Sequence, residues 1–111
     1  AKIYIKKLKN IKKIQLPFSE KNIYSCYHLF VIHINKRNKL KDFLYKYNIQ
    51  TGLHYPKPIH LQPAYKHLNY KIGDLKNCEY NSKYCLSLPM YNGLTKKEIL
   101  YICNKIKLFF K

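Results

Sequence analysis

The chain has 111 residues, a formal net charge of +17 and a hydrophobic content of 47%. A chain of this length forms one domain at most, and its hydrophobic content is typical of a globular protein and not of a disordered one. The longest apolar run, residues 27–34, is too short to cross a bilayer, and no apolar signal segment opens the chain. We therefore expect a cytoplasmic protein without a membrane partner.

The positive charge comes almost wholly from lysine, because Arg37 is the only arginine. Proteins that bind nucleic acids use arginine for bidentate contacts to bases and phosphates, and lysine replaces it poorly. The lysines are spread among many Ile, Asn and Tyr residues, a composition that A/T-rich codons produce. We expect no nucleic-acid partner, although a basic nucleic-acid-binding module stays open as an alternative.

The four cysteines lack the close C-x-x-C spacing that is typical of metal and redox sites. Cys26 and Cys103 fall in apolar segments, where a free cysteine behaves as a small hydrophobic residue. Without an export signal we expect all four thiols to be reduced. A metal site formed by His67, Cys78 and Cys85 is conceivable, but we predict no metal.

The first part of the chain predicts a helix followed by a strand. Residues 1–14 repeat apolar side chains at helical spacing, and Pro17 ends the pattern; the apolar positions are Tyr4, Leu8, Ile11 and Ile14. Residues 23–34 are rich in β-branched and aromatic side chains, which predicts a strand buried on both faces. We expect residues 1–17 to be the end of an interdomain helix with its linker, and residues 18–111 to be the domain itself.

The middle of the chain predicts a second helix and two short strands. An amphipathic helix over residues 35–48, capped by Asn35 or Asn38, is indicated by one apolar face, formed by Leu40, Phe43, Leu44 and Tyr47. Residues 49–55 predict a short strand ending before Pro56, and residues 84–91 predict another.

The C-terminal helix has the clearest local signal. Thr95 and Glu98 form a T-x-x-E capping box. One apolar stripe follows it, made of Ile99, Ile102, Cys103, Ile106 and Phe110. The order of elements predicts a small α/β or α+β unit.

Residues 51–71 have an unusual composition, with three prolines among histidines and tyrosines. Proline fixes φ and biases the preceding residue to an extended conformation, so Pro56, Pro58 and Pro63 predict a semi-rigid loop. The loop offers groups suited to binding a polar ligand, namely His54, Tyr55, His60 and Tyr65. Two alternatives stay open: the rings cover a hydrophobic edge, or His54, His60 and His67 bind a metal.

The chain lacks the motifs of a self-sufficient catalyst. It contains no Gly-rich phosphate loop, no nucleophile elbow and no H-E-x-x-H motif. Its five carboxylates show no pairing for acid–base chemistry. The loop therefore resembles part of a site whose remainder lies elsewhere.

The stretch YNIQTGLHYPKPIHLQPAYKHLNYKIGD, residues 47–74, resembles the signature of the DegT/DnrJ/StrS family of pyridoxal-phosphate-dependent sugar aminotransferases. The resemblance extends to YHLFVIHINKRNKLKDFLYKYNI before it and to CLSLPMYNGLTKKEILYICNKI after it. It covers nearly all of residues 4–110, in order. It implies the C-terminal small domain of a fold-type-I aminotransferase, with a short antiparallel sheet packed with helices.

The resemblance also implies an activity and partners for the longer protein. Pyridoxal 5'-phosphate would be bound mainly by a large domain that this chain lacks, and the lysine that forms the aldimine would lie there. No catalytic residue is therefore assigned to this chain, and the chain alone is expected to be inactive. The amino group would pass from glutamate to a keto group of a nucleotide-linked deoxysugar, with C-3 favoured over C-4. The longer protein is expected to be a homodimer.

By resemblance, the residues expected to bind substrate are His54 and Tyr55, with His60 a weaker candidate. The loop itself would be shaped by Gly52, Pro56, Pro58 and Pro63, and Leu61 and Tyr65 would pack. Asn48 stands where the family has glycine, which requires a left-handed asparagine. Leu75 and Lys76 replace the family's Phe–Pro. A non-catalytic standalone interaction domain stays open as an alternative.

Overall fold

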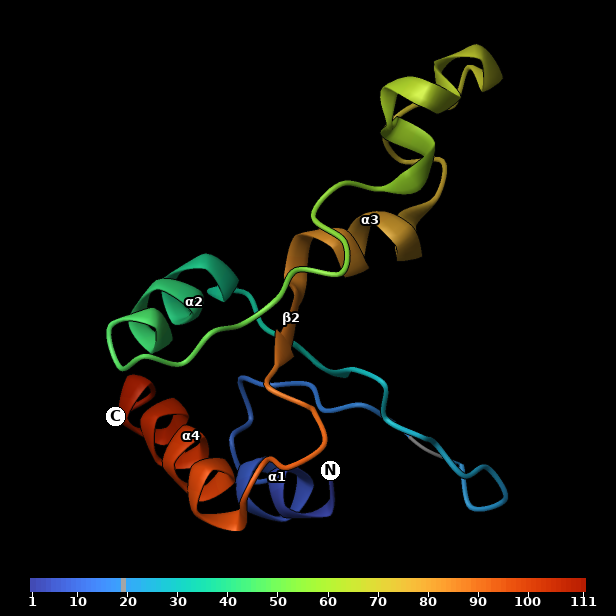
Figure 1. Cartoon of the computed structure of the whole chain (residues 1–111). Coiled ribbons are helices and arrows are strands. Elements are labelled where there is room, and N and C mark those ends of the chain that lie inside the picture. Colours follow the sequence, from blue (N-terminus) through green and yellow to red (C-terminus); the bar gives the residue numbers. More distant parts are fainter. Residues whose placement is uncertain (19) are drawn as a thin grey trace.

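The computed structural model describes residues 1–18 and 20–111. A two-stranded antiparallel sheet and three helices form the core (Figure 1). The elements in chain order are α1 (Lys2–Leu8), β1 (Phe30–His33), α2 (Arg37–Tyr45), the 3-10 turns η1 (Ile59–Leu61) and η2 (Pro63–Leu68), α3 (Lys76–Tyr84), β2 (Cys85–Leu88) and α4 (Lys96–Phe109). The predicted short antiparallel sheet packed with helices is therefore confirmed.

The sheet is wider than its two strands, because single residues pair along both of its edges. β1 pairs with β2 so that Ile32 faces Leu86. Gln15 then pairs with His33 on one edge, and Gly52 pairs with Ser87 on the other. The segment before the proline-rich loop is thereby joined to the sheet at one residue.

The hydrophobic core lies between the sheet and the helices, and α4 contacts both α1 and α2 (Figure 1). The expected apolar faces of α2 and α4 supply buried side chains, among them Leu40, Leu44, Ile102 and Ile106. Tyr4 is fully buried, and its hydroxyl donates to the Pro89 carbonyl at 3.1 Å. Burial raises the pKa of Tyr4 well above its usual value, so the hydroxyl stays neutral and keeps this bond.

An arm made of residues 56–84 extends from this core, and residues 17–18 and 20–26 lie on a second excursion (Figure 1). The Cα radius of gyration is 15.5 Å, larger than the roughly 13 Å expected of a compact chain of this length. The molecule measures 48 × 37 × 27 Å along its principal axes. No helix in residues 1–18 and 20–111 is long and apolar enough to cross a bilayer.

Several predicted boundaries are wrong, and the causes are tertiary. The first helix ends at Leu8 and does not reach residue 14, because the chain turns to pair Gln15 with His33. The strand expected over residues 23–34 spans only Phe30–His33, and burial alternates along it because only one of its faces meets the core.

The predicted strand over residues 49–55 is also wrong, since Gly52 is the one residue of this segment that pairs. α3 lies in a stretch that we expected to be irregular. Its asparagines and serine have low helix propensity, and Ser82 is its one buried residue, so the stretch has no apolar face to reveal a helix.

The helix termini show which local signals were sufficient. The capping box at α4 is confirmed: Thr95 N–H donates to Glu98 Oε2 at 2.7 Å, and Glu98 N–H donates to Thr95 Oγ1 at 3.2 Å. Asn48 has a φ of 58°, the left-handed conformation that we predicted. The predicted asparagine cap of α2 is wrong, because Lys36 occupies the cap position without a side-chain bond.

The only arginine has an intramolecular role. Arg37 Nη1 donates to the Ser82 carbonyl, and Arg37 Nε donates to Asn38 Oδ1. Arg37 therefore connects the start of α2 to α3. The guanidinium is thus already engaged within the chain, which does not favour the alternative of a nucleic-acid-binding module.

The capping box predicts the effect of Thr95→Ala. Loss of the Thr95 hydroxyl leaves the Glu98 N–H without its acceptor, and we expect a loss of about 1 kcal/mol in the free energy of unfolding by urea. Thr95→Ser keeps the hydroxyl and should retain most of the stability. A Thr95→Ala variant as stable as the parent chain would contradict the assignment.

The same cap predicts an acid dependence. The Thr95 side chain and backbone donate hydrogen bonds to the Glu98 carboxylate, and they lower the pKa of Glu98. This stabilisation is present above the ordinary glutamate pKa and is lost as pH falls through the lowered pKa of the folded chain. Between pH 7 and pH 3, the parent chain should lose more unfolding free energy than Glu98→Gln, which keeps a neutral capping box. If the parent chain and Glu98→Gln lose the same unfolding free energy over this range, the charge of Glu98 does not contribute to stability.

Candidate functional site

The candidate site begins where the proline-rich loop leaves the sheet. Gly52 and Ser87 exchange both backbone hydrogen bonds, at 3.0 and 2.8 Å. Ser87 is buried within β2. The chain at Gly52 is therefore held at the sheet edge, only two residues before the predicted substrate-binding pair.

Gly52 is required for space and not for backbone freedom. A Cβ at Gly52 would lie 2.5 Å from His54 Cε1 and 3.1 Å from its Nδ1, far inside ordinary contact. The imidazole of His54 therefore lies over the bare Cα of Gly52. His54 Nδ1 is 2.8 Å from Ser87 Oγ, which completes the attachment of this residue to β2.

Both members of the pair are exposed. The Tyr55 ring meets the His54 ring edge-on, with centroids 5.6 Å apart, and 71% of Tyr55 is exposed. The peptide bond between the two residues is cis. Tyr55 lines a cavity of about 730 Å³ between the loop and α3. Its other lining residues are Lys57, Pro58, Ile59, Gln62, Cys78, Asn81 and Ser82.

The structure places His60 differently from His54 and Tyr55. The His60 side chain is only 2% exposed, and its Nε2 is 3.1 Å from Glu79 Oε1 on α3. His60 is not among the residues that line the cavity beside Tyr55. The three residues expected to bind substrate are therefore divided into an exposed pair and a buried side chain.

The prolines expected to shape the loop lie at its turns. Pro58 occupies the N-cap position of η1, and Pro63 is the first residue of η2. Pro56 follows Tyr55 in an irregular stretch. The loop is therefore less extended than its prolines predicted. It contains two short 3-10 turns, and proline, with its fixed φ, suits the positions at which these turns begin.

No three His, Cys, Asp or Glu side chains of the described chain come together in a way that could hold a metal ion. Neither conceivable histidine-containing metal site is thus assembled. Cys103 is buried as expected, and burial raises the pKa of its thiol to about 11, so at neutral pH it is a protonated core residue. Cys26 is exposed, contrary to expectation, because it lies on the second excursion, away from the core.

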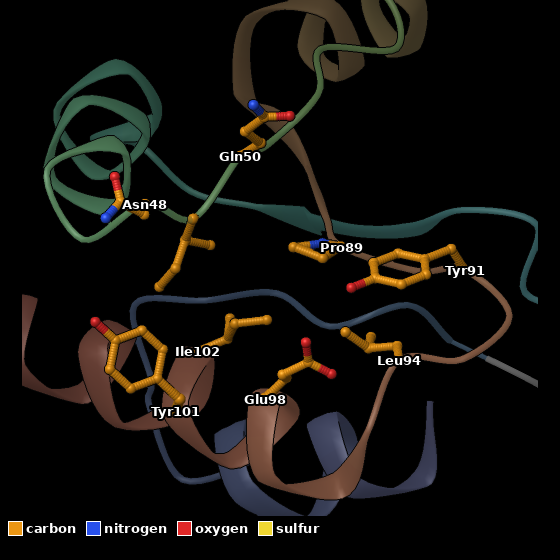
Figure 2. Close-up of a pocket in the computed structure, with 9 residues that line it drawn as sticks. Asn48, Gln50, Pro89, Tyr91, Leu94, Glu98, Tyr101 and Ile102 are labelled. Carbon is orange, nitrogen blue, oxygen red and sulfur yellow. The ribbon is translucent and has the colours of Figure 1, made fainter.

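A second cavity, of about 460 Å³, lies where α4 begins (Figure 2). Two of its polar groups already have partners within the chain. The Glu98 carboxylate closes the capping box, and the Tyr101 hydroxyl donates to the Tyr47 carbonyl at 3.4 Å. Apolar side chains such as Leu94 and Ile102 form much of the rest. The cavity beside Tyr55 is preferred as the candidate site because its lining includes a residue that the resemblance assigns to substrate binding and a cationic side chain, Lys57.

A model of the "DegT/DnrJ/EryC1/StrS aminotransferase family" matches residues 1–107. The chain belongs to this family. Among curated relatives, the "Pleiotropic regulatory protein" of Geobacillus stearothermophilus is 39% identical over 79% of this chain and 24% of the relative. The "dTDP-3-amino-3,4,6-trideoxy-alpha-D-glucose transaminase" of Streptomyces venezuelae is 30% identical over 94% of this chain and 27% of the relative.

Solved structures of family members share the fold. DesV of S. venezuelae, in complex with a ketimine intermediate, superposes with a TM-score of 0.92 at 29% identity, over 96% of this chain and 29% of DesV. A DegT/DnrJ/EryC1/StrS aminotransferase from Brucella abortus gives a TM-score of 0.86 at 31% identity, over 97% of this chain and 28% of that protein. This family member thus spans 24–29% of the length of these relatives.

Two residues at the site of this family member were not found from the sequence. Ser87 binds His54 from 33 positions away, and Glu79 binds His60 from 19 positions away. Ser87 lies in a strand pattern and Glu79 in a polar stretch without periodicity. Neither carries a local signal, because both act through contacts that only the folded sheet and α3 create.

The contact between Gly52 and His54 predicts a specific mutational effect. In Gly52→Ala the new methyl group should displace the imidazole and break its bond to Ser87, which costs about 1 kcal/mol of unfolding free energy. NMR of the His54 ring should show the displacement. His54→Ala removes the obstruction, so Gly52→Ala should cost much less in that background. Equal costs in the two backgrounds would show that the glycine acts through the backbone instead.

Proposed function

We propose that this chain is the C-terminal small domain of a pyridoxal-phosphate-dependent transaminase that acts on a nucleotide-linked keto sugar. The observation that carries the proposal is the arrangement of the HYP segment in a chain that belongs to an aminotransferase family. His54 is tied to β2 through Ser87, and it supports an exposed Tyr55 at the mouth of a cavity. We propose that these two side chains face the substrate.

The roles of the two side chains follow from their contacts. Ser87 engages His54 Nδ1, so the opposite ring nitrogen, Nε2, is the atom that can meet a sugar hydroxyl or a phosphate oxygen. The Tyr55 hydroxyl can donate or accept a hydrogen bond. Lys57 adds a positive charge to the same cavity, which suits the diphosphate of a nucleotide sugar. We propose that these groups bind and orient the substrate, and we assign the chemical step to none of the described residues.

The reaction position is proposed from the names of relatives. Two are dTDP-3-amino sugar transaminases, from S. venezuelae and Aneurinibacillus thermoaerophilus, and a third is a UDP-N-acetyl-3-dehydro-alpha-D-glucosamine 3-aminotransferase from Acidithiobacillus ferrooxidans. Their identities to this chain are 30%, 30% and 29%. On this basis we propose amination at C-3, with glutamate as the amino donor.

The described residues do not fit a complete cofactor site. The cavity beside Tyr55 is lined by one cationic side chain and by no carboxylate, whereas pyridoxal phosphate requires an acidic or similar partner at its ring nitrogen and a lysine that forms a Schiff base. We therefore propose that the cofactor is bound by other parts of a longer protein. No catalytic step is assigned to the residues of this chain.

Exposed apolar side chains support a larger assembly. Phe18 is 88% exposed and Tyr24 is 95% exposed on the second excursion, and Ile72 is 81% exposed on the arm. Exposed apolar side chains of this kind are typical of protein interfaces. We propose that these surfaces contact a large domain and a second subunit, as a homodimer would require. The cytoplasmic location expected from the sequence stays a prediction.

The proposal is tested by kinetics of the full-length protein with dTDP- and UDP-linked 3-keto sugars and glutamate. His54→Ala and Tyr55→Phe should each lower kcat/KM for the keto sugar by about tenfold to a hundredfold, because each loses a hydrogen bond to a charged or polar substrate. Tyr45→Phe, at a tyrosine of α2 that is 72% exposed, is the matched control and should change little.

Two outcomes would contradict this function. One is a full-length protein in which the His54 and Tyr55 variants keep the parent kcat/KM. The other is a stoichiometric, borohydride-reducible adduct between pyridoxal phosphate and one lysine of the isolated 111-residue chain, since that would place the cofactor site within this chain.

A further inference from the structure

His60 is buried within the arm and makes one directed contact. Its residue is 4% exposed, and its Nε2 lies 3.1 Å from Glu79 Oε1. A carboxylate oxygen accepts hydrogen bonds, so Nε2 carries the proton and donates. This bond joins η1 in the loop to α3.

The same oxygen of Glu79 holds a third segment. The Gly73 N–H donates to Glu79 Oε1 at 2.8 Å. Gly73 has a φ of 100°, a conformation that favours glycine, and it lies in a turn where the Lys71 N–H donates to Asp74 Oδ2 at 2.8 Å. One carboxylate thus links η1, this turn and α3, which are the principal parts of the arm.

The other ring nitrogen of His60 has no free approach. Within the described chain, Nδ1 of His60 is buried and has no hydrogen-bond partner. The edge of the ring also meets Tyr70, with centroids 6.0 Å apart. An imidazole enclosed in this way has little contact with solvent, and its directed contact is with Glu79 and not with the cavity beside Tyr55.

We propose that His60 and Glu79 are positioning residues: they lock the loop onto α3 and so set the shape of the cavity beside Tyr55. The two walls of that cavity are loop residues 55–62 and α3 residues 78–82. Ile59 and Cys78 line the cavity, and each is the direct neighbour in sequence of a residue of the lock. The functional part of this inference rests on the proposed function; the structural part does not.

The lock is tested first by amide hydrogen exchange, measured by NMR on the 111-residue chain. His60→Leu keeps a similar volume but removes the donor, and His60→Gln keeps an N–H near the place of Nε2. His67→Leu is the matched control, because His67 is an exposed histidine of the same arm. The reference is the amide of Ile32 in β1.

In His60→Leu, exchange of the Gly73 amide and of residues 56–75 should rise by about tenfold or more, because the hydrogen bond to a charged group is lost. Exchange at Ile32 should not change. His60→Gln should restore the protection of the arm, which a role in packing alone would not predict. Unchanged exchange in His60→Leu, failure of His60→Gln to restore it, or an equal rise in His67→Leu would overturn the lock.

The functional part is tested in the full-length protein. His60→Leu should raise the KM for the keto sugar by about tenfold and leave kcat within about twofold, because displaced cavity walls weaken binding of substrate and transition state alike. His60→Gln should restore the KM. Faster exchange with an unchanged KM would overturn the positioning role. The proposed function fails separately, if the His54 and Tyr55 variants keep the parent kinetics.

Discussion

Ser87 is the residue through which the candidate site is joined to the core. Its backbone exchanges two hydrogen bonds with Gly52, its hydroxyl meets His54 Nδ1 at 2.8 Å, and its neighbours in β2 pair with β1. A buried hydroxyl requires a partner, and His54 supplies it. The pairing of Ser87 with Val31 therefore determines where His54, and with it Tyr55, lies relative to the hydrophobic core.

Beyond this junction the arm is held by polar contacts more than by buried apolar surface. Glu79 binds His60 and Gly73, and Arg37 binds the carbonyl of Ser82. Few apolar side chains of the arm are buried, and Ile72 is 81% exposed. Segments with little buried apolar area open locally at low free energy. Hydrogen bonds to charged groups hold such a segment in one conformation, as a segment that lines a binding site requires.

The sequence predicted those elements whose signals are local. The capping box at Thr95 identified the start of α4, and the apolar stripe that follows identified its buried face. The left-handed Asn48 was expected from the resemblance, because the family has glycine at this helix end. The sequence predicted which segment carries the site and which residue types lie in it. It did not predict that His60 is buried while His54 and Tyr55 are exposed, because the burial of His60 depends on Glu79, which lies in a helix without apolar periodicity.

By itself, the sequence determined the resemblance to a family, the helices with strong apolar faces and the segment that carries the candidate site. These depend on composition and spacing within a few turns of chain, where propensity and periodicity act. Only the tertiary structure decided that Gly52 makes room for the His54 ring, that Tyr55 is exposed and that His60 is enclosed. The positions of His54 and His60 depend on Ser87 and Glu79, which lie 33 and 19 positions away in the chain, and these contacts exist only once the sheet has paired and α3 has packed beside the loop.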